Sequence, residues 1–197
     1  VFLLDYRLAP EHPYPAALED GMAAYQALLD LDVDPKNITF AGDSAGAAHI
    51  LAMAVYARNE GIPLPAGLVM ISPFVDMTLT SESIRTKSKA DPMLSVVPLQ
   101  RGVQAYCAEE LAADPKVSPV FAELEDLPPM FIQVGSDEIL LDDALLLESR
   151  AKEAGVQVSC TVYPGMWHNF QMFSAFVEKA DKALWAIADF IRRGESQ

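Results

Sequence analysis

Short apolar runs alternate with helix-like stripes along the whole sequence, and this alternation limits the possible folds more than any other feature. The runs lack the period-two pattern of a half-exposed strand, which indicates strands buried on both faces. We expect strands at residues 1–6, 38–42, 67–71, 130–134 and 156–162. Helical stripes lie between and after them, at residues 18–29, 45–56, 144–154 and 173–191. This order predicts an α/β fold with a mostly parallel sheet and helices on both faces.

The middle of the chain, residues 76–129, departs from this alternation. It is polar and rich in proline, and it is too long for an ordinary connection between elements. Long insertions of this kind are usually lids or binding loops carried on a rigid sheet. Because 197 residues suit one domain, we predict a single domain over 1–197, with 76–129 as a lid or substrate-binding insertion.

The charge balance is strongly acidic. The sequence holds 28 Asp and Glu against 14 Lys and Arg, a formal net charge of −14. Nucleic acids and anionic membranes are bound mainly by Lys and Arg, so neither is expected as a partner. No apolar run approaches the roughly 18 residues that a membrane-spanning helix needs.

Cysteine usage and short motifs give no sign of a cofactor. Cys107 and Cys160 are too few for a disulfide framework and lack metal-site spacing. The patterns H-E-x-x-H and C-x-x-C do not occur, nor does a phosphate-binding glycine loop. We therefore expect no metal, nucleotide or other cofactor, and a cytoplasmic location. Because Val1 opens an apolar run without signal-peptide features, we expect a fragment that begins inside a buried strand.

The strongest functional motif is Gly42-Asp43-Ser44-Ala45-Gly46, which has the pattern G-x-S-x-G. An apolar run precedes it and a helical stripe follows, as the nucleophile-elbow turn requires. Such a turn places the serine at a helix N-terminus, where free N–H groups and the helix dipole stabilise negative charge. We predict Ser44 as a nucleophile and the N–H of Ala45 as an oxyanion-hole donor. In the alternative interpretation, Ser44 merely caps the helix.

A serine nucleophile needs a base, and the sequence has three histidines. His12 lies in a proline-rich turn, and His49 shares a helical stripe expected to face the sheet, so both are interpreted as structural. His168 follows the last expected strand, at the edge where catalytic groups of open α/β sheets gather. We predict His168 as the base.

The acid that orients this histidine is expected after the fourth strand, in Gly135-Ser136-Asp137-Glu138. The order serine, acid, histidine is that of the α/β-hydrolases. We predict Asp137 as the acid because it comes first after the Gly-Ser turn, with adjacent Glu138 as the alternative. Asp142 and Asp143 are expected to begin the next helix, where acidic residues suit the dipole.

Four segments carry a family resemblance along the chain: Asp5-Tyr6-Arg7-Leu8-Ala9-Pro10-Glu11-His12-Pro13, Gly42-Asp43-Ser44-Ala45-Gly46, Gly135-Ser136-Asp137 and Gly165-Met166-Trp167-His168. Together they resemble the hormone-sensitive-lipase-like (bacterial family IV) esterases. The resemblance implies an α/β-hydrolase fold, a triad of Ser44, Asp137 and His168, and hydrolysis of small carboxylic esters through an acyl-enzyme. Ile71-Ser72-Pro73 and Asp91-Pro92-Met93-Leu94 also resemble hydrolases of small esters or lactones.

Two departures from this family stand out. Ala47 replaces a usual glycine, which is a small change. The family's His-Gly-Gly-Gly loop, which completes the oxyanion hole, is not among these 197 residues. We therefore keep a second hypothesis, a non-catalytic or inactive binding protein with the same fold.

The expected partner is a small ester or lactone substrate, and the last helix could pair with a second copy in a homodimer. Phe74, Met77 and Met93 could line an apolar acyl pocket or equally belong to the core. A peptidase or amidase would use the same triad.

Overall fold

The structure is a computed structural model that describes residues 1–194. Its centre is a four-stranded parallel sheet in the order β1-β2-β3-β4. The strands are β1 (Thr39–Asp43), β2 (Gly67–Ile71), β3 (Met130–Gly135) and β4 (Val158–Tyr163). Four of the five predicted strands therefore form, and the parallel sheet is confirmed.

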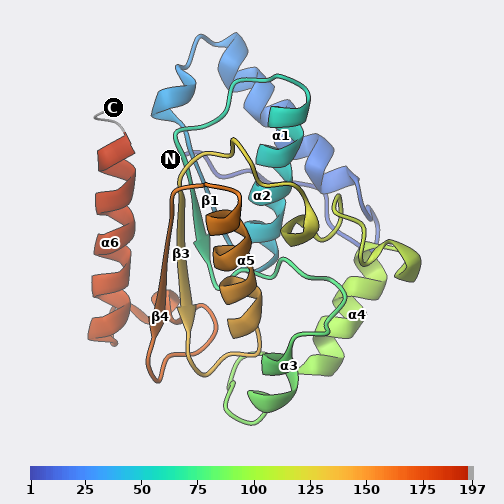
Figure 1. Cartoon of the computed structure of the whole chain (residues 1–197), viewed down its shortest axis with the longest axis vertical. Coiled ribbons are helices and arrows are strands. Elements are labelled where there is room, and N and C mark those ends of the chain that lie inside the picture. Colours follow the sequence, from blue (N-terminus) through green and yellow to red (C-terminus); the bar gives the residue numbers. More distant parts are fainter. Residues whose placement is uncertain (195–197) are drawn as a thin grey trace.

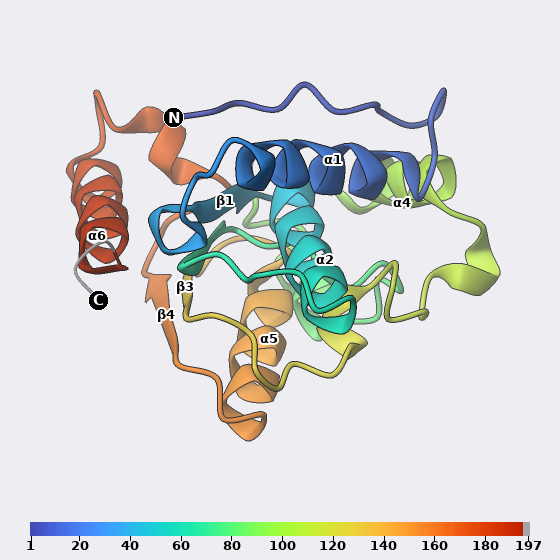
Figure 2. The same ribbon diagram turned by 90° about the horizontal axis from the view of Figure 1, so that it is seen from above.

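Helices cover both faces of the sheet, as predicted (Figure 1). The main helices are α1 (Ala16–Asp30), α2 (Ala45–Asn59), α5 (Leu141–Glu153) and α6 (Glu178–Gly194). Helices α2 and α5 lie on one face and α6 on the other, while α1 crosses α2 as an outer layer (Figure 2). Within residues 1–194, no helix combines the length and apolarity needed to cross a membrane.

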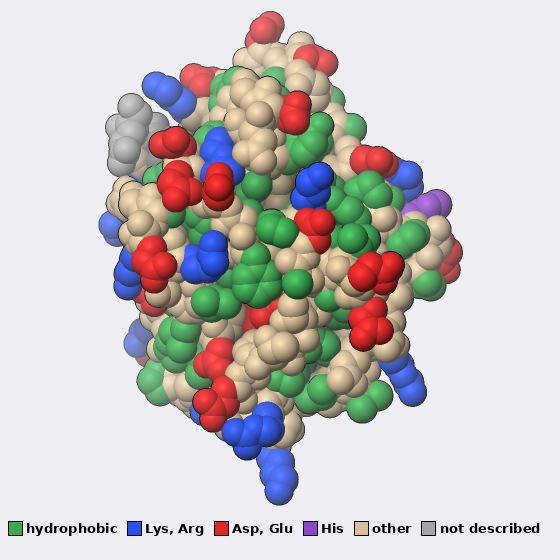
Figure 3. All heavy atoms as spheres, turned by 45° about the vertical axis from the view of Figure 1, so that its right-hand side comes forward, with side chains coloured by type: hydrophobic (Ala, Val, Ile, Leu, Met, Phe, Trp, Pro, Cys, Tyr) green, Lys and Arg blue, Asp and Glu red, His purple; other side chains and the backbone are tan. Residues whose placement is uncertain are grey.

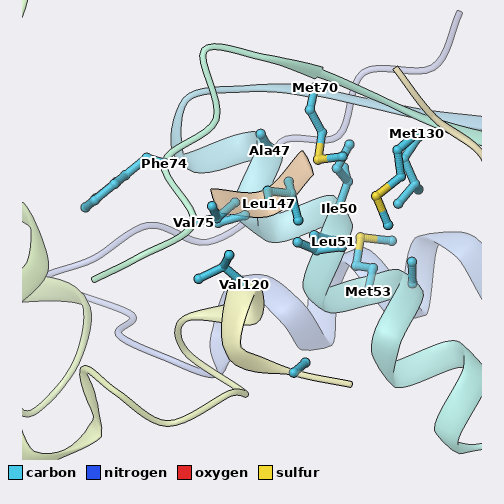
Figure 4. Packing of buried hydrophobic residues seen from close by; sticks show 14 of the residues in the cluster. Ala47, Ile50, Leu51, Met53, Met70, Phe74, Val75, Val120, Met130 and Leu147 are labelled. Atoms are coloured by element: carbon cyan, nitrogen blue, oxygen red, sulfur yellow. The ribbon is translucent and has the colours of Figure 1, made fainter. Parts of the chain in front are cut away.

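The main core lies between the sheet and helix α2. Met70 and Met130 from the strands face Ile50, Leu51 and Met53 of α2 (Figure 4), and all five side chains are buried. Close packing of this kind holds the strands, and therefore the loops at their ends, in fixed positions.

The buried face of α2 differs from the predicted stripe. Of the stripe residues only Ala48 is buried, and Ala45, His49, Ala52 and Tyr56 are partly or fully exposed. Residues outside the stripe, such as Ile50 and Leu51, are buried. This helix packs on strands, on α1 and on a short 3₁₀ helix at Pro119–Phe121, so it is apolar on several sides. Periodicity alone cannot choose among several apolar faces.

The predicted strand at residues 1–6 does not form. This segment runs in extended, irregular form across the top of the molecule in Figure 2. The Tyr6 ring stacks on His49 with ring centres 4.9 Å apart, and Arg7 forms an ion pair with Asp20 at 2.8 Å. These contacts hold the segment against α1 and α2, and β1 pairs only with β2 among the described strands.

The helix expected at residues 144–154 forms as α5 (Leu141–Glu153), whereas the last stripe begins before α6 does. Helix α5 ends at Glu153, and Gly155 follows with a φ of +74°, the left-handed conformation that glycine favours. The last stripe predicts a helix from residue 173, but Phe170–Phe173 form a 3₁₀ turn and α6 begins at Glu178.

Residues 76–129 carry the short helix α3 (Glu82–Thr86), helix α4 (Val96–Tyr106) and two 3₁₀ helices, Glu109–Leu111 and Pro119–Phe121. On this side of the molecule, apolar side chains are interspersed with charged ones (Figure 3). Val120 and Leu124 are buried in the main core, so the end of the segment belongs to the body of the domain. That the segment acts as a lid or substrate-binding insertion stays a prediction.

Buried carboxylates fasten this segment to the start of α5. Asp143 accepts hydrogen bonds from the N–H groups of Val75 and Asp76, both at 3.0 Å, and from the Ser81 hydroxyl at 2.8 Å. Asp91 similarly accepts from the N–H of Ile139 at 3.0 Å. Burial raises the pKa of Asp143 to about 7, although the Ser81 hydroxyl and the two backbone N–H donors oppose the shift.

The raised pKa of Asp143 predicts how stability depends on pH. The folded state binds this proton more tightly than the unfolded state, so the contribution is present in acid and is lost as pH rises through about 7. The melting temperature of the unsubstituted protein minus that of the Asp143→Asn variant should therefore decrease as the pH is raised from about 5 to about 8. Thermal unfolding of both proteins at each pH measures this difference. A difference that stays constant or grows with pH would contradict the assignment.

Candidate active site

Loops after the four strands meet at one edge of the sheet, because the carboxyl ends of parallel strands lie together. Ser44 follows β1, Ser72 follows β2, Glu138 follows β3 and His168 follows β4. The edge therefore gathers two hydroxyls, a carboxylate and an imidazole from four separate parts of the sequence.

Ser44 occupies a strained turn between β1 and α2, as the motif predicts. Its φ of +52° and ψ of −121° are rare for a residue with a side chain, and persist only where the surroundings enforce them. The loop after β2 does so: Ser44 N–H donates to the Ile71 carbonyl at 2.9 Å, and the Ser44 carbonyl accepts from Phe74 N–H at 3.1 Å.

Gly42 permits the close contact between β1 and the start of α2. A Cβ at this position would collide with the Gly46 carbonyl and would lie 2.9 Å from the nitrogen of Ala47. A Cβ on Gly46 would meet nothing within 4 Å. The two glycines of the motif thus differ, because only the first is required by the packing around its own Cβ position.

His168 lies in the loop that follows β4 and is buried, with 4 % of its surface exposed. Its Nδ1 lies 2.9 Å from Oε2 of Glu138. The histidine loop approaches β3 closely at Gly135, where a Cβ would stand 2.6 Å from the carbonyl carbon of Met166. The Asp137 N–H donates to the Met166 carbonyl at 2.9 Å and fixes this approach.

Glu138, not the predicted Asp137, is the partner of His168. The Glu138 side chain is fully buried, and its Oε1 accepts from the Gly135 N–H at 2.5 Å and from the Ser72 hydroxyl at 3.0 Å. Asp137 is partly exposed, and its Oδ1 accepts from the Ser136 hydroxyl at 2.9 Å. The structure does not place Asp137 against His168, because in this turn the Asp137 side chain is partly exposed whereas that of the next residue, Glu138, is buried.

Asn169 ties the histidine loop to the serine turn. Its Nδ2 donates to Asp43 Oδ2 at 2.6 Å, which joins the residue after His168 to the residue before Ser44. Asn169 has a φ of +53°, a conformation that asparagine tolerates better than most residues. The predicted serine and histidine are thereby connected through their immediate neighbours.

A cavity of about 460 Å³ opens beside Ser44 and Ala45, the first residue of α2. The three side chains considered for an acyl pocket, Phe74, Met77 and Met93, all line it. Phe74 and Met77 are also buried in the main core cluster, so the two interpretations hold together for them.

The other two histidines, His12 and His49, line this cavity. Within residues 1–194, neither forms a hydrogen bond with Glu138. His49 packs on Tyr6 and faces α1 near Gly21, not the sheet as predicted. Burial lowers the pKa of His49, which favours its neutral form. Over residues 1–194, no three His, Cys, Asp or Glu side chains are grouped so that they could hold a metal ion.

Sequence reasoning assigns no role to two polar residues of this edge, Ser72 and Asn169. Ser72 follows strand β2 and Asn169 follows strand β4, the same kind of position on which the prediction of His168 rests. Polar residues directly after buried strands were therefore the available signal. Glu138 directly precedes the apolar pair Ile139-Leu140, a further sign that this part of the turn enters the core.

Similarity to known proteins extends over almost the whole chain. Residues 1–172 match the family described as alpha/beta hydrolase fold. An esterase of Acinetobacter venetianus is 46 % identical over 191 residues, which are 96 % of this chain and 63 % of that protein. An acetyl-hydrolase of Streptomyces hygroscopicus is 38 % identical, over 98 % of this chain and 64 % of the relative.

Comparison with solved structures gives the same fold. An esterase from the bacterial hormone-sensitive lipase family superposes with a TM-score of 0.95 at 41 % identity, over 98 % of this chain and 65 % of that one. The chain belongs to the α/β-hydrolase fold family, in its hormone-sensitive-lipase-like branch. It spans less than two thirds of the length of these relatives.

The two glycines of the serine turn offer a matched pair of variants. Gly42→Ala should lower the free energy of unfolding by about 1–3 kcal/mol or more, because its Cβ meets backbone that cannot move aside. Gly46→Ala should leave it unchanged or raise it by up to about 1 kcal/mol, since alanine favours a helix. Denaturant unfolding measures both. Equal effects of the two substitutions would show that the close contact at Gly42 is not needed.

Proposed function

We propose that the protein is a serine hydrolase of carboxylic esters. Ser44 is the nucleophile, His168 the base, Glu138 the acid that orients the base, and the Ala45 N–H a donor to the oxyanion. The observation that carries the proposal is the buried Glu138–His168 pair, at the same sheet edge as a serine in a strained turn beside a cavity.

The chemistry follows from these positions. The Ser44 hydroxyl attacks the ester carbonyl carbon while its proton passes to Nε2 of His168. The tetrahedral oxyanion then collapses, the bond to the alcohol oxygen breaks, and the alcohol leaves with the proton from His168. Water attacks the acyl-serine in the same manner, which releases the carboxylic acid and restores Ser44.

The cavity lining favours small esters with apolar groups. Its wall beside Ser44 is built from side chains such as Ala48, Phe74 and Met77. Arg7 also lines it, but its guanidinium is already paired with Asp20 and Glu19. We include lactones among the substrates, because a cyclic ester offers the same carbonyl and leaving oxygen. The names of the relatives, esterase and acetyl-hydrolase, support the ester class.

Covalent labelling tests the nucleophile directly. In the parent protein, meaning the gene product that contains this chain, a fluorophosphonate probe should label Ser44, and p-nitrophenyl butyrate should be hydrolysed. Ser44→Ala should abolish labelling and lower turnover by roughly 10³-fold or more, because triad residues act as a unit. Mass spectrometry locates the label. A folded parent without label at Ser44 would leave the non-catalytic hypothesis in place of this one.

Variants of two neighbouring residues, Glu138 and Asp137, test which of them is the acid that orients His168. Glu138→Gln should lower kcat by roughly 10³–10⁴-fold, because an amide facing Nδ1 favours the tautomer whose proton occupies Nε2. Asp137→Asn should retain kcat within about tenfold, since its side chain contacts Ser136 and not His168. Steady-state kinetics of both variants provide the comparison. The reverse order of effects would return the role to Asp137.

A further inference from the structure

We infer that Ser72 is a positioning residue of this active site: its hydroxyl holds the Glu138 carboxylate and the backbone after His168 in one geometry. The inference rests on the proposed function and adds a residue to which neither the motif nor the triad assigns a role.

The Ser72 hydroxyl joins two loops that the chain brings together from distant positions. It donates its hydrogen to Glu138 Oε1 at 3.0 Å and accepts from the N–H of Asn169 at 3.1 Å. A hydroxyl has one hydrogen to donate and lone pairs to accept, so both contacts are satisfied at once. The same oxygen atom thus holds the Glu138 carboxylate and the backbone of Asn169, the residue directly after His168.

The backbone of Ser72 is fixed as firmly as its side chain. Its N–H donates to the Gln133 carbonyl at 2.7 Å, and its φ is +46°, in the left-handed region. The neighbouring residues Ile71 and Phe74 hold the backbone of Ser44. The loop after β2 therefore braces the nucleophile with its backbone and the acid with the hydroxyl of Ser72.

The orientation of Glu138 depends on this contact. A fully buried carboxylate needs a donor for each oxygen, and Oε1 has only the Gly135 N–H and the Ser72 hydroxyl in the described structure. Without the hydroxyl, Oε1 keeps only the Gly135 N–H, and the carboxylate is held by that donor and by His168, two contacts in place of three. Hydrogen bonds to charged groups are stronger than those between neutral groups, so loss of this one should loosen the geometry of the Glu138–His168 pair.

Ser72 has no surface to offer a substrate, because it is fully buried. Its removal should therefore change the rate of the chemical step and not the binding of the ester. This separates a positioning role from a contribution to the pocket.

The test uses two substitutions in the parent protein. Ser72→Ala and Ser72→Gly both remove the hydroxyl, but glycine accepts the left-handed φ without strain and keeps the turn even if the alanine variant does not fold. In both we expect kcat to fall about ten- to hundredfold, as for loss of a hydrogen bond to a charged group. KM should stay within about twofold, since ground-state binding is unaffected.

A double substitution shows whether the hydroxyl acts through Glu138. In a Glu138→Gln background, Ser72→Gly should slow the single-turnover labelling of Ser44 by less than about twofold, because the group that it positions is already disabled. Equal effects in the two backgrounds would overturn the positioning role, as would a folded Ser72→Gly protein with the kcat of the parent.

Failure of the proposed function gives a different result. If a folded parent is not labelled at Ser44, the proposed function fails and the role of Ser72 fails with it. If the parent is labelled and Ser72→Gly reacts as fast, only the inference about Ser72 fails.

Discussion

The arrangement of the candidate active site depends on one buried carboxylate, that of Glu138. Burial of an unpaired charge costs several kcal/mol, so Glu138 is compatible with the fold only if donors surround it. Those donors come from its own turn, from the loop after β2 and from the imidazole after β4. The requirement to satisfy one charge thus fixes three loops relative to each other, and His168 takes the orientation that this imposes.

Much of this site could be predicted because the relevant signals are local. The apolar run before Gly42 and the helical stripe after Ser44 together define a strand-turn-helix unit, and His168 follows a strand that periodicity identifies. The acid could not be chosen in the same way. Asp137 and Glu138 differ by one position, and the choice depends on how the turn faces a loop 30 residues further along the chain.

Two other predictions, the strand at residues 1–6 and the buried face of α2, also differ from the structure because they depend on tertiary contacts. The apolar segment at residues 1–6 has the composition of a buried strand, but a strand needs a partner and tertiary contacts hold this segment over α1 and α2. The face of α2 was assigned wrongly because the helix contacts several elements at once. Local composition predicts burial for Val1, Phe2 and Leu3, which are exposed, because the neighbours that cover a residue are a property of the assembled fold.

The bond between Asn169 and Asp43 spans 126 positions of the chain, and that between Asn169 and Ser72 spans 97. Contacts of such long range form late, because the entropy of closing large loops must be overcome before they gain anything. Helices and neighbouring strand pairs can assemble earlier without them. During refolding we therefore expect the arrangement around His168 to be among the last to form, after most of the native secondary structure is present.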